Sequence, residues 1–156
     1  MWIGLIGCVA TGASARNVEG KVDVTLNGDP VGCSAAKLVP RTPETERAIR
    51  EQFGTLAPAA LPVTADVVRA TAVRGPEPGS REVRCYDWRG YGTLFGFRFR
   101  NVRPGNYFVT LLARPKQDGR PDANISTGNS SQAIYLMQPV RVAATGANVR
   151  FDYQRK

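Results

Sequence analysis

The sequence predicts an all-β fold, an antiparallel Greek-key β-sandwich of about seven to nine strands with one short helix inserted at about residues 43–53. Short runs in which apolar and polar residues alternate recur along the chain, as expected of half-buried strands. Turn-forming sequences such as Asn27-Gly28-Asp29-Pro30 separate these runs. With 156 residues, of which 42% are apolar and 22% charged, the chain is long enough to fill one core of this kind.

The clearest alternation lies between Leu94 and Ala113. Phenylalanines occupy every second position from Phe95 to Phe99, and they alternate with Gly96, Arg98 and Arg100. Because neighbouring side chains of a strand point to opposite faces, this pattern gives one aromatic and one cationic face. Pro104-Gly105 then forms a turn, and Tyr107, Val109 and Leu111 resume the inward alternation. The segment is therefore predicted to be a hairpin with its aromatic face in the core.

The other elements follow from alternation and capping signals. Val22, Val24 and Leu26 predict a first strand, and further strands are expected at residues 31–39, 63–73, 81–88, 133–142 and 148–153. Thr42 is a suitable N-cap and Pro43 a suitable first residue for the helix, which Gly54 ends.

The hairpin sequence resembles that of a known domain family. The segment from Gly96 to Val109, GFRFRNVRPGNYFV, is similar to the characteristic hairpin of carboxypeptidase regulatory-like domains. Weaker similarities cover the rest of residues 20–39 and 93–153, whereas residues 40–90 have no counterpart. The resemblance implies a transthyretin-like (prealbumin-like) sandwich and a largely non-catalytic accessory or binding module.

The N-terminal segment Leu5-Ile6-Gly7-Cys8 resembles the bacterial lipobox, in which the cysteine becomes lipidated. On this interpretation, residues 1–7 are a remnant or truncated lipoprotein signal peptide, and residues 8–18 are a tether. Residues 19–156 then form the sandwich, with an insertion at residues 40–90. Only seven residues precede Cys8, and none is basic. The alternative is an accidental match, with Cys8 a buried thiol in a frayed terminus.

If Cys8 carries lipid, Cys33 and Cys85 are left to form a disulfide. An oxidising cell envelope would favour that bond, so the two inferences support each other. The alternative is a pair of buried free thiols in a cytosolic protein.

The composition excludes several kinds of site. The chain has no histidine, so a Ser-His-Asp triad or a histidine-containing zinc site cannot be built from it. The acidic residues are scattered, and Asp118, Asp122 and Asn124 lack the pattern of a calcium loop. We expect no catalytic residue, cofactor or metal.

The formal charge of +8 comes mainly from arginine, which accounts for 17 of the 21 basic residues. Five arginines are predicted to form a cationic face that is either simply solvated or contacts an anionic glycan or lipid: Arg98, Arg100, Arg103, Arg141 and Arg150. Nucleic acid is not an expected partner, because the phenylalanines lie on the face opposite the arginines.

These observations predict a non-enzymatic, lipid-anchored module on the periplasmic side of the bacterial cell envelope, with the outer membrane the expected location. It would bind or support another envelope component rather than a small-molecule substrate, through a long loop that includes Lys116, Asp118, Arg120, Asp122 and Asn124. The alternative function, by analogy of fold, is a transthyretin-like lipoprotein subunit of a secretion machine that contacts an inner-membrane partner.

Overall fold

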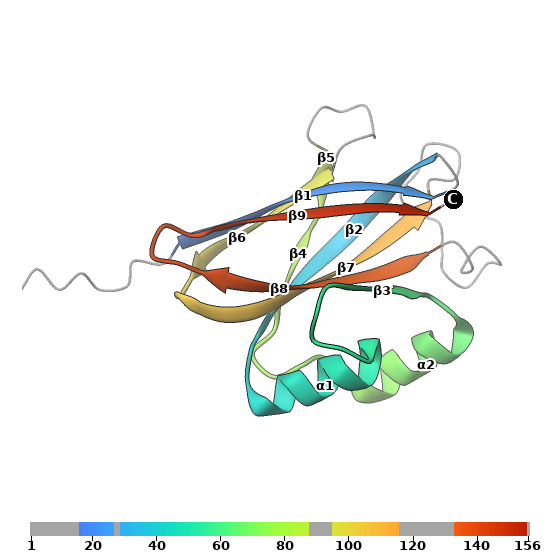
Figure 1. The fold of residues 1–156 in the computed structure, drawn as a ribbon, viewed down its shortest axis with the longest axis horizontal. Helices are drawn as coiled ribbons and strands as arrows, with labels where there is room; N and C mark the ends of the chain where they lie inside the picture. Colours follow the sequence, from blue (N-terminus) through green and yellow to red (C-terminus); the bar gives the residue numbers. More distant parts are fainter. Residues whose placement is uncertain (1–15, 27–28, 88–94, 116–132, 156) are drawn as a thin grey trace, which may run out of the picture.

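The computed structural model describes residues 16–26, 29–87, 95–115 and 133–155 (Figure 1). The predicted lipidation site at Cys8 and the predicted contact residues of the loop, from Lys116 to Asn124, lie outside these residues.

The described residues form nine strands and two helices. In chain order they are β1 (Arg16–Leu26), β2 (Asp29–Pro40), α1 (Pro43–Phe53), β3 (Ala59–Pro62), α2 (Ala65–Arg74), β4 (Arg81–Arg84), β5 (Tyr86–Asp87), β6 (Phe95–Val102), β7 (Gly105–Pro115), β8 (Ile134–Val142) and β9 (Ala147–Arg155).

The strands make two layers that are joined at one corner (Figure 1). Sheet A has the order β9-β1-β6-β5, and sheet B the order β3-β8-β7-β2-β4. The corner is the short pairing of β1 with β2, where Leu26 lies opposite Asp29. One pairing departs from the antiparallel prediction. The first and last strands, β1 and β9, lie side by side and pair as parallel strands. The two-sheet, mostly-β architecture is confirmed, and the Greek-key connections stay a prediction.

The main core lies between the two sheets, and the β6–β7 hairpin fills much of it as the sequence predicted. Phe97 and Phe99 are fully buried, whereas Arg98 and Arg100 on the same strand are exposed. The ring of Phe97 lies directly over Gly20 of β1, at a place where any Cβ would overlap it. Gly20 therefore allows sheet A to hold an aromatic ring against its own backbone.

A second, smaller core forms on the outer face of sheet B. Ile49 of α1 is fully buried there and packs with Val39, Phe108 and Met137, which belong to three strands of the sheet. Thr42 caps α1 as expected: its hydroxyl accepts a hydrogen bond from the Thr45 amide. The molecule thus has a third layer, formed by the helical insertion (Figure 1).

The prediction of a strand at residues 63–73 was wrong, because helix α2 occupies Ala65–Arg74. The valines of this segment suggested a strand, but the capping groups favour a helix. The Thr64 hydroxyl accepts from the Val67 amide, and the Gly75 amide donates to the Thr71 carbonyl. The insertion therefore holds two helices instead of one.

Two strand boundaries also differ from the prediction. β1 begins at Arg16, and Val18 is fully buried, so the last residues assigned to the tether belong to the sandwich. The strand expected at residues 81–88 is divided at Cys85 into β4 and β5.

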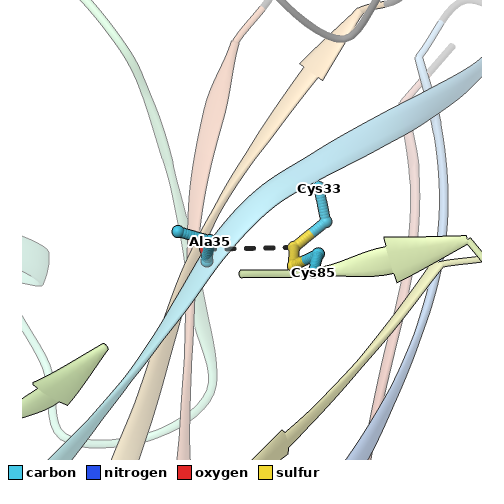
Figure 2. Close-up of a disulfide and its surroundings, with 3 residues drawn as sticks. All are labelled: Cys33, Ala35 and Cys85. Carbon is cyan, nitrogen blue, oxygen red and sulfur yellow. Dashed lines mark hydrogen bonds between the residues drawn. A yellow bond between two sulfur atoms is a disulfide. The ribbon is translucent and has the colours of Figure 1, made fainter. Parts of the chain in front are cut away.

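The predicted disulfide between Cys33 and Cys85 is confirmed, with a Cα–Cα distance of 5.7 Å (Figure 2). Cys85 is the only residue between β4, which pairs with β2 in sheet B, and β5, which pairs with β6 in sheet A. The Cys33 sulfur lies 3.9 Å from the Ala35 carbonyl oxygen. This is a contact without a hydrogen bond, since a disulfide sulfur carries no proton. The bond fixes the point where the chain passes from one sheet to the other.

Replacing both cysteines, Cys33→Ala with Cys85→Ala, is expected to lower the free energy of unfolding by about 3–4 kcal/mol, because the bond closes a long loop of the unfolded chain. Urea denaturation of the folded domain measures this. Reduction of the wild type should give a similar loss, and Cys8→Ser should give none. Equal midpoints for the double variant and the wild type would contradict a disulfide in the folded protein.

Candidate functional site

A groove of about 490 Å³ lies on the outer face of sheet B, next to the helical insertion. Its floor comes from strands β2, β4, β7 and β8, and its walls include Gln52 of α1, Thr71 of α2 and Glu77 after α2. The remaining lining residues are Ser34, Ala35, Ala36, Lys37, Glu82, Arg84, Thr110, Leu111, Leu112, Arg114 and Tyr135.

Strand alternation explains why polar side chains gather here. Leu38 of β2 and Leu111 of β7 are buried in the main core, so the residues that alternate with them point the other way. The register then sets Lys37 opposite both Glu82 of β4 and Thr110 of β7. The groove is thus the part of this outer face that α1 leaves open.

One ion pair joins the floor of the groove to its wall. The Lys37 ammonium nitrogen lies 3.2 Å from Oε2 of Glu77, whose side chain is only 7% exposed. A buried carboxylate is costly without a partner, so Lys37 holds the segment after α2 against the sheet. A second polar contact joins the two helices, where Arg74 donates a hydrogen bond to the Gln52 side-chain oxygen at 3.4 Å.

The other polar groups of the groove are suited to binding a polar ligand. Glu82 and Arg84 are exposed, and Tyr135 is half-buried in the floor. The described lining residues include three cations, Lys37, Arg84 and Arg114, and two carboxylates, Glu77 and Glu82. They therefore present donors, acceptors, an aromatic ring and a small excess of positive charge.

The five arginines of the predicted cationic face do not share one face. Arg98 and Arg150 lie on the outer face of sheet A, and each is paired: Arg98 Nε is 3.0 Å from Glu19 Oε1, and Arg150 Nε is 2.8 Å from Asp152 Oδ2. Arg141 lies on β8 of sheet B, opposite Asn106. The prediction that Arg141 extends the cationic face was wrong. Alternation within a strand shows which residues share a face of that strand, but it does not show which sheet the strand joins.

The other two arginines lie close to the hairpin turn. Arg100 is exposed on β6, and its carbonyl oxygen accepts a 2.6 Å hydrogen bond from Arg81. Arg103 is exposed in the turn between β6 and β7, where its carbonyl accepts from the Tyr107 hydroxyl at 2.7 Å. Neither side chain lines the groove.

The sequence prediction did not find the groove. Its floor strand β7 does lead to the predicted binding loop, since Arg114 precedes Lys116 by two residues and lines the groove. A usable signal was the alternation of Glu82 and Arg84 around Val83, which packs against the main core. The pairing of this short strand with β2 could not be predicted from the sequence and is seen only in the folded structure.

A second cleft, of about 280 Å³, opens between the edges of the two sheets. Leu136 and Gln138 of β8 line one side, and Phe151 and Tyr153 of β9 the other. The side-chain oxygen of Gln138 is buried, and no described residue donates a hydrogen bond to it. A buried acceptor of this kind costs stability.

The described part of the chain lacks two further features. It contains no cluster of three acidic, cysteine or histidine side chains able to hold a metal ion. Neither described helix is long and apolar enough to cross a membrane.

Sequence comparison finds no family model and no curated protein that matches the chain. A solved structure is among those similar to this chain. It is the crystal structure of a "putative carbohydrate binding protein" from Pseudomonas aeruginosa, with 13% sequence identity and a TM-score of 0.48, covering 91% of this chain and 89% of that one. Identity and TM-score are both low, so this similarity says nothing about the chemistry of the groove.

Substituting Gln138→Met is expected to raise the free energy of unfolding by about 1 kcal/mol, because it removes a buried acceptor without a donor while keeping the side-chain volume. Thermal or urea denaturation measures the gain. Gln52→Met is the matched control. The Gln52 oxygen already accepts a hydrogen bond from Arg74, so removing this oxygen should not raise the free energy of unfolding. A lower midpoint for Gln138→Met would contradict the assignment.

Proposed function

We propose that this chain is a non-enzymatic binding module of the bacterial cell envelope, tethered by a lipid on Cys8, which holds an acidic glycan in the groove on sheet B. The observation that carries the proposal is the groove itself, where charged and polar side chains from four strands and the helical insertion converge.

The disulfide supports the envelope location. Disulfides persist in the periplasm and other oxidising compartments, and are rare in the bacterial cytosol. Cys33 and Cys85 form one at the point where the chain passes from sheet B to sheet A. A protein that is exported in this way also meets the condition for lipidation of Cys8, on the periplasmic side of the outer membrane.

The chemistry of the lining favours an acidic sugar. Sugar hydroxyls both donate and accept hydrogen bonds, which suits a lining that combines Glu82 with Lys37 and Arg84. Arginine binds a carboxylate or phosphate through two parallel hydrogen bonds, and the excess of cations attracts an anionic ligand. Tyr135 presents an aromatic body against which the apolar face of a sugar ring can pack.

Calorimetric titration with oligogalacturonate, and with a neutral maltooligosaccharide of the same length, tests the groove. The acidic oligomer is expected to bind more tightly, and Arg84→Glu to weaken it by at least about ten-fold, as expected for loss of a charged hydrogen bond. The matched control is Arg103→Glu, which makes the same change of charge outside the groove and should leave the affinity within about two-fold.

Two outcomes would contradict this function. Equal affinity for the acidic and neutral oligomers would remove the role of the cations. A loss of binding in Arg103→Glu, but not in Arg84→Glu, would place the ligand at the hairpin turn instead.

The lipid anchor is tested separately by the intact mass of the protein expressed in a host that exports it. A chain that begins at Cys8 and carries a diacylglycerol group is expected, and Cys8→Ser should leave the protein in the soluble periplasmic fraction. An unprocessed chain that retains Met1 in such a host would contradict the anchor.

A further inference from the structure

Strand β9 presents a long edge at one side of sheet A. It pairs with β1 along nine consecutive residues without a register shift, and no described strand pairs with its other edge. Among the described residues, the opposite edge of sheet A is the two-residue strand β5. β9 contains no proline or bulge of the kind that protects strand edges. This edge, which no described strand covers, is therefore suited to accept another strand.

We propose that a second copy of this chain covers this edge, with β9 pairing antiparallel to β9 of the copy. The two-fold axis passes at Phe151, which lies opposite its own counterpart. Sheet A of one molecule then continues into sheet A of the other. An interface of this type is self-complementary, as two-fold dimers require.

The charges on β9 select this register. Arg150 and Asp152 are both exposed on the outer face, with Phe151 between them. With Phe151 opposite itself, each Arg150 lies opposite Asp152 of the second copy. A shift of two residues in either direction sets two Arg150 or two Asp152 side chains opposite each other, which destabilises antiparallel strands.

The inner face of β9 fits the same register. Val149 then lies opposite Tyr153 of the copy, and the two Phe151 rings are neighbours. Such pairs of aromatic and β-branched residues stabilise adjacent strands. Because Phe151 and Tyr153 also line the second cleft, the added strand would close the side where the sandwich is open.

The charges contribute specificity more than affinity. Arg150 and Asp152 form an ion pair within one molecule, with side chains 66% and 58% exposed. Exposed pairs of this kind stabilise weakly, so the backbone hydrogen bonds and the covered apolar residues supply most of the association. Reversing one charge nevertheless places two like charges opposite each other twice per dimer.

Sedimentation velocity on the oxidised Cys8→Ser chain tests the dimer. The parent chain is expected to sediment as a dimer, and both Arg150→Asp and Asp152→Arg to weaken association by at least about ten-fold. The combined swap, Arg150→Asp with Asp152→Arg, should restore the dimer, because opposite charges face each other again. Arg98→Asp is the control, since it changes a charge on the same face away from the edge.

The proposal is overturned if the parent chain remains a monomer up to the highest soluble concentration. It is also overturned if a dimer forms that neither single variant weakens, because β9 would then lie outside the interface. The thermal midpoint of each variant shows that it is folded. The groove lies on the other sheet, so its ligand binding does not depend on either result.

Discussion

The disulfide between Cys33 and Cys85 is the constraint on which the architecture depends, because it holds the chain where it passes from sheet B to sheet A. Strand β2, which carries Cys33, contributes to three parts of the molecule. Its Leu38 fills the main core, its Val39 packs under α1, and its Lys37 lies in the groove. A shift of β2 would therefore disturb packing on both faces of sheet B.

The helical insertion gives this sandwich its candidate site. A bare sheet face offers a flat surface, but α1 covers one part of sheet B, and the segment after α2 forms a wall beside the rest. The Lys37–Glu77 pair holds that wall in place. The charged residues of β4 complete the groove because the disulfide anchors the end of that strand.

The sequence predicts what local rules decide, and fails where the tertiary arrangement decides. Period-two alternation identified the β6–β7 hairpin, capping residues identified α1, and the count of cysteines led to the disulfide. α2 was missed because its valines are typical of strands, although Thr64 and Gly75 are helix caps. The groove was missed because its residues come from six elements and the turn after α2, which only the register and the packing of the insertion bring together.

The most direct measurement of whether the disulfide-held groove is the binding site is hydrogen–deuterium exchange, with and without acidic oligosaccharide, in oxidised and reduced protein. Ligand should slow exchange in residues 34–37, 81–84 and 110–114 of the oxidised protein. This protection should fall on reduction, because only the backbone pairing then holds β4 to β2. Protection confined to β6 or β9, or protection that reduction leaves unchanged, would contradict a binding site held in place by the Cys33–Cys85 bond.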